Sequence, residues 1–230
     1  MMKKIKILLA TLIVAWTMTS CVDNSGQYVG QLYTTAQKHA AVKECLVQSK
    51  DSALNHLFVD NGFYNYNDGA YRIDYSALAA ALMDTLSQHG LGYLNDSLIV
   101  ATNHLATNCR SAMSDALTTA INEMEYWDYD GLIGGSDDAI TQYFKKFKND
   151  DLKAALQSPV SIRMNVFNVN NIWNEMVAQY YSICGTPVGA DVQGYIINKM
   201  LDGVYLEMME EEYLIRTDTN HQNENTILFR

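Results

Sequence analysis

Cys21 is the residue whose surroundings most clearly predict a covalent modification. Thr19 and Ser20, both small enough for a peptidase pocket, stand directly before it, and an apolar run over Ile7–Trp16 precedes them. Three basic residues come before that run: Lys3, Lys4 and Lys6. Such an order forms a secretion signal, and the run is far shorter than the roughly 20 residues that cross a bilayer. We therefore expect residues 1–20 to be a lipoprotein signal peptide, cleaved between Ser20 and Cys21, and the Cys21 thiol to carry lipid through a thioether.

The leader also predicts where the chain resides. Several acyl chains, palmitate among them, hold a protein durably on a membrane, whereas a single chain binds only marginally. Val22 follows Cys21 and Asp23 comes only at the next position, so a strong mark for inner-membrane retention is absent. We expect a protein of the bacterial cell envelope, anchored in the outer membrane and facing the periplasm. An ordinary secretory leader and an uncleaved anchor are the alternatives, since Met18 stands where lipoprotein signals usually carry Leu.

Four aspartates crowd one glycine-bearing connection and invite comparison with a calcium site: Asp128, Asp130, Asp137 and Asp138. Calcium prefers carboxylate oxygens, but its twelve-residue loop needs Gly at position six and Glu at position twelve, and this stretch does not fit that spacing. Asp137 and Asp138 instead follow Ser136 in the first turn of a predicted helix, where negative charge interacts favourably with the helix dipole. We therefore expect no metal site here.

The remaining reactive residue types do not form a catalytic or cofactor-binding pattern. The histidines stand singly, without the HxxxH or HExxH spacing of zinc sites, and Gly134-Gly135 lacks the lysine of a phosphate-binding loop. Three cysteines follow Cys21: Cys45, Cys109 and Cys184. They cannot all pair with one another, so buried thiols on helices and one bridge with a free thiol both remain open. We expect no cofactor and lean against an enzyme.

The charge of the chain argues against nucleic acid as a partner. The whole sequence has 16 Lys and Arg against 26 Asp and Glu, a formal net charge of −10. The leader holds three of the basic residues and none of the acidic ones, so the chain after residue 20 carries −13. A domain this acidic repels phosphate backbones and anionic lipid headgroups. Membrane contact is therefore expected through the N-terminal lipid alone.

The hydrophobic pattern predicts an all-α fold. Apolar residues recur at helical spacing, and two prolines and 13 glycines are too few for the turns of a β-sandwich or barrel. We expect a flexible tether over residues 21–34, a single multi-helix domain over residues 35–216 and a polar C-terminal tail over residues 217–230. The predicted helices cover residues 35–57, 75–88, 95–124 with a break near 108–109, 136–148, 150–166, 168–183 and 187–216.

Residues 58–75 interrupt the helical pattern. Aromatic side chains stand on both sides of Asn67-Asp68-Gly69, among them Phe63, Tyr66 and Tyr71. Gly and Asn or Asp accept the positive φ angles of tight turns. We therefore expect one small β-hairpin or an extended aromatic loop near residues 58–75, packed on the helices.

Three motifs resemble, in chain order, those of a known family. The first and weakest is Gly62-Phe63-Tyr64 with Arg72-Ile73. The second is Gly134-Gly135-Ser136-Asp137-Asp138-Ala139-Ile140-Thr141-Gln142-Tyr143-Phe144, and the third is Met200-Leu201-Asp202-Gly203-Val204-Tyr205 followed by Glu210-Glu211-Glu212 and Ile215-Arg216. The chain is thereby similar to the bacterial domain-of-unknown-function family 4197, which are exported helical proteins. The resemblance implies an exported helical fold and carries no established activity.

The same motifs nominate one candidate functional cluster: Asp137, Asp138, Thr141, Tyr143, Asp202, Glu211 and Arg216. Glu210-Glu211-Glu212 would ordinarily be a solvated helix face, but the i+4 spacing of Glu212 and Arg216 predicts an ion pair. The family usually has Asn-Arg-Ala-Ala-Glu where this chain has Asn103-His104-Leu105-Ala106-Thr107. A charged site built on that Arg and Glu is therefore not carried over.

These observations favour a lipid-anchored, non-catalytic binding or structural module of the cell envelope, with an envelope protein as partner. A helical carrier pocket for a lipid or other apolar small molecule is the first alternative, because Met200, Met208 and Met209 form an adaptable apolar patch. An enzyme whose reaction the residues do not name is the second. A cleft that gathers the candidate cluster would favour the enzyme.

Overall fold

The all-α prediction is confirmed. The structure is a computed structural model that describes residues 33–229, so the leader, Cys21 and nearly all of the predicted tether lie outside the described residues. No strand occurs within residues 33–229. The helices are α1 Thr35–Leu57, α2 Gly62–Gly69, α3 Ser76–Gln88, α4 Gly92–Thr107, α5 Arg110–Asn122, α6 Tyr129–Ile133, α7 Ala139–Val166, α8 Val169–Cys184 and α9 Val192–Thr217, followed by the 3-10 turns η1 Thr219–His221 and η2 Thr226–Phe229.

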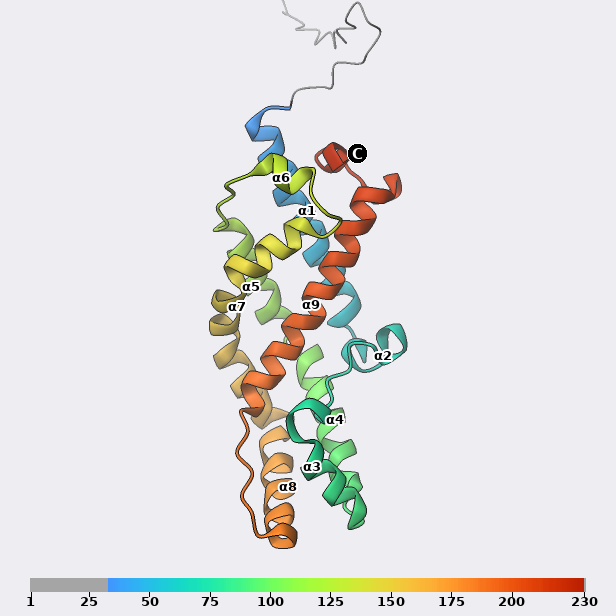
Figure 1. The fold of residues 1–230 in the computed structure, drawn as a ribbon, viewed down its shortest axis with the longest axis vertical. Coiled ribbons are helices and arrows are strands. Elements are labelled where there is room, and N and C mark those ends of the chain that lie inside the picture. The colour runs from blue at the N-terminus through green and yellow to red at the C-terminus, as the bar shows by residue number, and fades with distance from the viewer. Residues whose placement is uncertain (1–32, 230) are drawn as a thin grey trace, which may run out of the picture. The chain divides into compact units, whose positions relative to one another are not determined.

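The helices divide into two groups within the compact unit that begins at Thr35 (Figure 1). α9 packs along α1 and α7, and α5 packs on α1 and α7, which gives one group of long helices. α3, α4 and α8 pack on one another and form the end of the unit away from the start of α1. Fully buried side chains fill the space between the long helices, among them Leu46, Leu117, Phe144 and Val204. This burial of apolar surface is the main stabilising contribution.

A glycine on α9 allows a close approach of neighbouring helices. A Cβ placed on Gly203 would lie 3.3 Å from the ring of Phe63 and 3.5 Å from Leu57, so the absence of a side chain lets α1 and α2 pack tightly here. Gly194 has a different role, because its N–H donates to the Asp191 carboxylate at 2.8 Å and a Cβ would collide with that side chain. Asp191 is therefore the N-cap of α9, which begins later than the predicted start at Pro187.

The predicted β-hairpin near residues 58–75 is wrong. Asn67 and Asp68 do adopt the expected left-handed conformation, with φ of 49° and 54°, but they end the short helix α2 and lead into a single extended stretch. The N–H of Ile73 donates to Asn103 Oδ1 at 2.9 Å, and Asn103 Nδ2 donates back to the Ile73 carbonyl at 2.8 Å. One buried amide side chain on α4 thus bonds both backbone groups that a second strand would have paired.

One further boundary differs from the sequence prediction, and another is confirmed. The helices expected over residues 136–148 and 150–166 are one helix, α7, because the polar Lys148–Asp151 stretch contains no residue that breaks a helix. Pro159 lies inside α7 and removes one N–H, which leaves the Ala155 carbonyl without its α-helical donor. The break predicted near residues 108–109 is confirmed, since α4 ends at Thr107 and α5 begins at Arg110.

Asn103→Leu tests the pairing that replaces a strand. The substitution keeps the side-chain volume but leaves the buried Ile73 N–H and C=O without partners, so we expect the free energy of unfolding to fall by about 2–4 kcal/mol. Urea denaturation followed by circular dichroism measures the change. Asn108→Leu, which replaces an exposed amide at the C-cap position of α4, should stay within about 0.5 kcal/mol of the wild type. Equal losses in the two variants would contradict the interpretation.

Candidate functional site

Three glutamates on α9 are buried although each side chain ends in an ionisable carboxyl group. Glu207, Glu211 and Glu212 are 4%, 8% and 0% exposed, whereas Glu210 between them is exposed. Burying a carboxylate is costly unless hydrogen bonds or an opposite charge satisfy it. The partners of these three side chains therefore show what this part of the structure does.

Glu212 caps a helix that lies 71 residues earlier in the sequence. Its Oε2 accepts hydrogen bonds from the Thr141 amide and hydroxyl, both at 2.8 Å, and its Oε1 accepts from the Ile140 amide at 3.0 Å. The first amides of a helix have no partner within it, and the N-terminus carries partial positive charge. Asp138, at the N-cap position of α7, makes no side-chain cap bond. The carboxylate from α9 therefore takes over the capping of α7.

Arg216 completes this network from the next turn of α9. Its guanidinium donates to Glu212 Oε1 from Nη2 at 2.7 Å and from Nε at 3.1 Å, which confirms the predicted i+4 ion pair. The other donors reach the carbonyls of Ile133 at 2.8 Å and Leu132 at 2.9 Å, at the end of α6. The guanidinium carbon also lies 5.0 Å from the centre of the Phe229 ring. One side chain thus joins α9, α6 and the C-terminal turn η2.

Glu211 and Glu207 join α9 to α1 and to the tail. Glu211 Oε1 accepts from Gln48 Nε2 at 2.9 Å and lies 3.0 Å from His221 Nδ1. Glu207 Oε2 lies 2.6 Å from His56 Nδ1, and the His56 ring stacks on Tyr66 with centroids 4.8 Å apart. Each of the three carboxylates therefore has a different set of partners.

The candidate cluster predicted from the sequence does not form one cleft. Thr141 and Arg216 meet through Glu212, and Asp138 lies beside them. Hydrogen bonds from Gln142 and Ser136 lower the pKa of the Asp138 carboxyl, and the charge of Arg216 lowers it further. Glu211 faces α1 instead.

The other three members of the cluster lie away from this network. Asp137 is exposed, and the Tyr143 hydroxyl donates to the Glu125 carbonyl at 3.1 Å. Asp202 is exposed and lies 3.8 Å from Lys145. Along α9, Asp202 and Arg216 are about 21 Å apart. Glu212, the residue that connects the two matching motifs, was predicted only as the ion-pair partner of Arg216.

Comparison with protein-family models shows the family of this chain. The model of a family described as protein of unknown function (DUF4197) matches residues 32–229. The chain belongs to this family. No curated protein and no solved structure matches it. Two of the segments that resemble DUF4197 proteins, residues 134–144 and 200–216, contact each other through Glu212.

Two of the residues at which the sequence resemblance fails lie at a small cavity. His104 and Thr107 of α4 line a space of 250 Å³ together with Asp60 and Phe167. The Thr107 hydroxyl is buried and has no hydrogen-bond partner within the described residues. The cavity is therefore lined by the exposed imidazole of His104 and the buried hydroxyl of Thr107.

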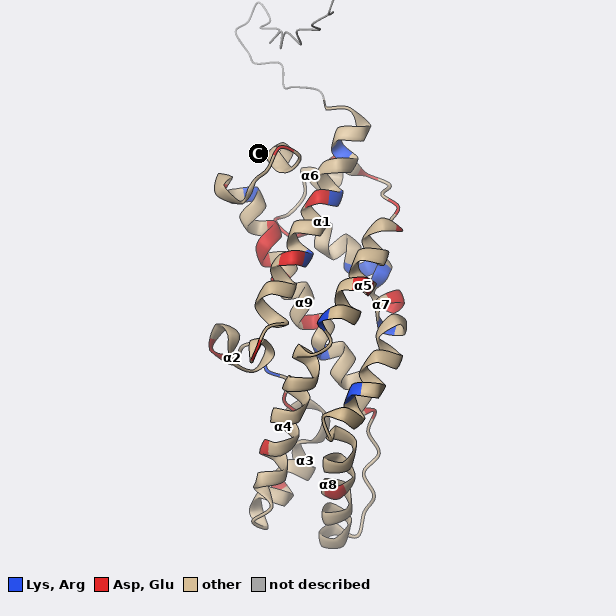
Figure 2. Cartoon of the chain, turned by 180° about the vertical axis from the view of Figure 1, so that it is seen from behind, with Lys and Arg blue, Asp and Glu red and all other residues tan. Residues whose placement is uncertain are grey.

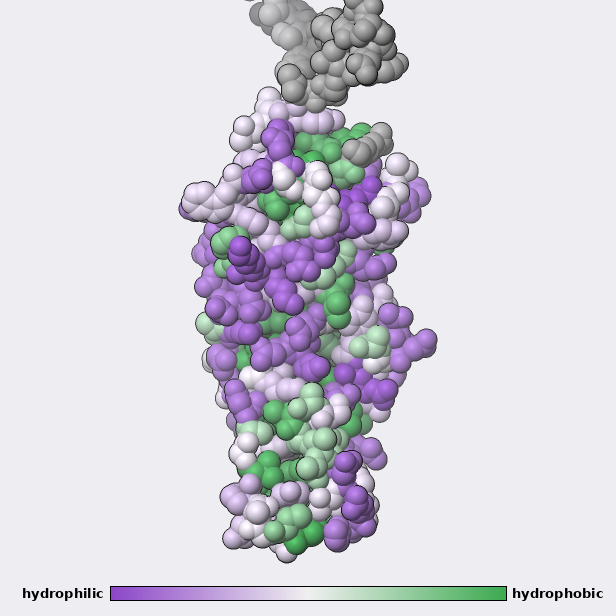
Figure 3. Space-filling model, in the orientation of Figure 1, coloured by the Kyte–Doolittle hydropathy of each residue, from purple (hydrophilic) through white to green (hydrophobic). Residues whose placement is uncertain are grey.

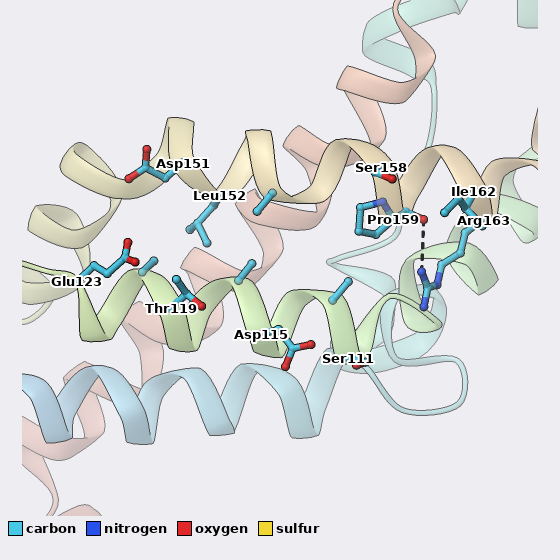
Figure 4. A pocket seen from close by; sticks show the side chains of 14 residues that line it. Ser111, Asp115, Thr119, Glu123, Asp151, Leu152, Ser158, Pro159, Ile162 and Arg163 are labelled. Carbon is cyan, nitrogen blue, oxygen red and sulfur yellow. Dashed lines mark hydrogen bonds between the residues drawn. The ribbon is translucent and has the colours of Figure 1, made fainter.

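The larger opening is a groove between α5 and α7 (Figure 4). It has a volume of 560 Å³. Ala112, Ala116 and Ala120 recur on one side of α5, and Leu152 and Pro159 of α7 point toward them. Because the alanines are short, the two helices leave space between them. The lining residues are Ser111, Ala112, Asp115, Ala116, Thr119, Ala120, Glu123, Asp151, Leu152, Ala155, Ser158, Pro159, Ile162 and Arg163.

Both signs of charge occur at the rim of this groove. Lys148 lies 3.2 Å from Asp151 and 4.0 Å from Glu123, and Arg163 donates to the Asn108 carbonyl at 2.8 Å and to the Pro159 carbonyl at 3.3 Å. The arrangement presents an apolar floor with polar groups at its edges. Such a lining suits a polypeptide better than a purely apolar molecule.

The cysteines differ sharply in environment. Cys45, Cys109 and Cys184 are all free thiols, the first two buried and the third exposed. Burial raises the pKa of the Cys45 thiol well above its usual value and that of Cys109 to about 11.

Within the described residues, no group of three or more His, Cys, Asp or Glu is placed to hold a metal ion, and no helix has the length and hydropathy to cross a membrane.

Glu212→Ala tests the buried network. It removes the cap of α7 and leaves the Arg216 guanidinium buried without its counter-charge, so we expect the free energy of unfolding to fall by about 3–5 kcal/mol. Glu210→Ala, which shortens an exposed neighbour, should change it by less than about 0.5 kcal/mol. In a double-mutant cycle with Arg216→Ala, the two losses should be far from additive. Additive losses would show that the pair is not coupled.

Proposed function

We propose that the chain is a lipid-anchored protein of the bacterial cell envelope whose helical unit is a non-catalytic binding module. The basic and apolar leader, the small residues before Cys21 and the −13 charge of the chain after it support attachment through lipid alone. The absence of a strong retention signal after Cys21 supports the outer membrane, with the domain in the periplasm.

The proposal of a non-catalytic module depends on the hydrogen bonds that the buried carboxylates of α9 make to neighbouring helices. A general acid or base must reach the substrate with a free lone pair or proton. Glu212 is fully buried and accepts hydrogen bonds at both oxygens, and Glu211 and Glu207 are each bonded to residues of α1. These side chains hold the helices together, which supports a scaffold more than a reaction centre.

The α5–α7 groove is the surface that we assign to the partner. Its 560 Å³ lies within the range of binding sites in proteins, and it is bounded by two helices, as in complexes where a helix fills a groove. The polar rim favours a segment of an envelope protein. An apolar small molecule is the second candidate, supported by the Ala, Leu152 and Ile162 side chains of the lining.

Cys21→Ala tests the anchor. Without the thiol no thioether can form, so we expect the protein to leave the membrane fraction of lysed cells or to remain as an uncleaved precursor. Cell fractionation with immunoblotting, together with the mass of the mature N-terminal peptide, measures both outcomes. Cys184→Ala, which removes an exposed thiol of the helical unit, serves as the control and should leave attachment and processing unchanged. Membrane attachment and processing of Cys21→Ala as in the wild type would refute the lipoprotein assignment.

Ala116→Trp tests the groove. The indole fills the space between α5 and α7, so proteins captured from solubilised envelopes by the wild type should be depleted about tenfold or more with this variant. Ala154→Trp places the same side chain at an exposed position of α7 outside the groove and should capture them normally. Quantitative mass spectrometry compares the three captures. Loss with both variants, or with neither, would remove the groove from the proposal, and turnover of a defined substrate would favour an enzyme instead.

A further inference from the structure

A second groove runs along the exposed side of α4. It consists of two adjoining cavities, of 490 Å³ and 250 Å³, which share His104 and Phe167 in their linings. The larger cavity lies over the middle of α4, and the smaller one lies between the end of α4 and the loop that joins α1 to α2. From Asp96 to Asn108 this α4 groove follows the helix for about 18 Å. None of its lining residues lines the α5–α7 groove, so the two surfaces are separate.

Carboxylates mark the two ends of the α4 groove. Asp96 lines the larger cavity and Asp60 the smaller one, and both side chains are exposed. Neither carboxylate forms an ion pair within residues 33–229. Arg110 and Arg163 approach the smaller cavity, but their guanidinium groups donate to backbone carbonyls, and no Lys or Arg lines either cavity. The charge of the lining is therefore negative.

The helices around the α4 groove add to its negative potential. No Lys or Arg occurs within residues 73–109 or 164–198, whereas five acidic residues do: Asp74, Asp84, Asp96, Glu175 and Asp191. These two segments contain α3, α4 and α8, which carry red segments and no blue ones in Figure 2. A cleft lined by one sign of charge focuses the electric field and raises the local concentration of counter-ions. The α4 groove therefore favours a cationic ligand.

The middle of the α4 groove is apolar. Val100 is 38% exposed, and Ala101 and the Phe167 ring are partly buried. Figure 3 shows that hydrophobic side chains also lie on the surface at the end of the unit formed by α3 and α8. A compact hydrated ion gains nothing from an apolar lining, whereas methylene groups are stabilised by contact with it. The face of the Phe167 ring is in addition able to attract a cation.

The polar side chains of the α4 groove offer unused acceptors. The Ser97 hydroxyl donates to the Tyr93 carbonyl at 2.7 Å, so the lone pairs of its oxygen remain free. Asn108 Nδ2 donates to the His104 carbonyl at 2.9 Å, and Asn108 Oδ1 has no partner within the described residues. Thr107 is 9% exposed, and its hydroxyl likewise lacks a partner there. Because buried polar groups in native proteins are usually hydrogen-bonded, this lining suits a ligand that brings N–H donors.

We propose that the α4 groove binds a linear aliphatic polyamine. The ammonium groups of such a molecule supply positive charge and N–H donors, which suit Asp96 at one end and Asp60 at the other. The methylene chain between them fits the apolar middle at Val100 and Phe167. A neutral apolar molecule would gain no attraction from the two carboxylates. The site goes beyond the binding function proposed above, because it does not use the α5–α7 groove.

Length distinguishes a polyamine from a simple amine in this groove. A molecule with one ammonium group reaches one of the two carboxylates, whereas a chain with ammonium groups along its length meets both at once. The second contact is then intramolecular, which raises the overall affinity without a new kind of interaction. We therefore expect spermine, which has amino groups at both ends and between them, to bind much more tightly than butylamine.

Calorimetric titration of the full chain in a non-ionic detergent, with spermine as the probe, tests the proposal. We expect one spermine per chain with a dissociation constant below about 1 mM, and no measurable binding of tetraethylene glycol, a neutral chain. Asp96→Asn and Asp60→Asn should each raise the constant about fivefold, the effect of losing one exposed ion pair. Asp137→Asn removes the same charge at an exposed position before α7, outside the α4 groove, and should leave the constant unchanged.

Nuclear magnetic resonance locates the contact. Spermine should shift the backbone amide signals of residues 60–61, 96–108 and 167, and Val100→Trp, which fills the larger cavity from an exposed position, should abolish these shifts. Circular dichroism verifies that each variant is folded. Equal weakening by Asp96→Asn and Asp137→Asn would reveal general attraction to an acidic chain and overturn the proposal. Absence of spermine binding, displacement of spermine by magnesium at equal ionic strength, or binding of tetralysine in place of spermine would overturn it as well.

Discussion

The buried carboxylate of Glu212 is the interaction on which the arrangement of the long helices depends. A buried ion loses several kcal/mol of hydration, and only a full set of donors compensates for that loss. Here the donors come from two helices: two amides and a hydroxyl at the start of α7, and the guanidinium of Arg216 on α9. Arg216 in turn needs the carbonyls at the end of α6. The network therefore requires α6, α7 and α9 to be in place together.

The other buried glutamates extend this constraint along α9. Glu207 meets His56, and Glu211 meets Gln48 and His221, so the helix has a distinct polar contact with α1 at successive turns. Sliding α9 by one turn, about 5.4 Å, would move each carboxylate away from its own donor, and Glu212 would leave the amides at the start of α7. An apolar stripe alone would tolerate that shift much better. The charges thus fix the register of the longest interface, which explains their burial without invoking a reaction.

Much of the fold could be predicted from the sequence because its helices are set by local patterns. The periodic apolar positions gave α1, and the break between α4 and α5 was visible at Asn108-Cys109. The i+4 spacing predicted the pairing of Glu212 with Arg216. The prediction of a hairpin failed because it depended on a residue far away in the chain. The hairpin was ruled out by Asn103, which lies 30 residues beyond Ile73, and no local pattern indicates that an amide would pair with that backbone.

In the candidate site, too, local sequence predicted the helices, whereas contacts between distant residues could not be predicted. Glu210, Glu211 and Glu212 look alike in the sequence, yet one is exposed and two are buried, because only the packing of α1 and α7 against α9 distinguishes them. The link from Glu212 to Thr141 spans 71 residues. The helical motif around Thr141 was recognised, but its partner could be found only in three dimensions.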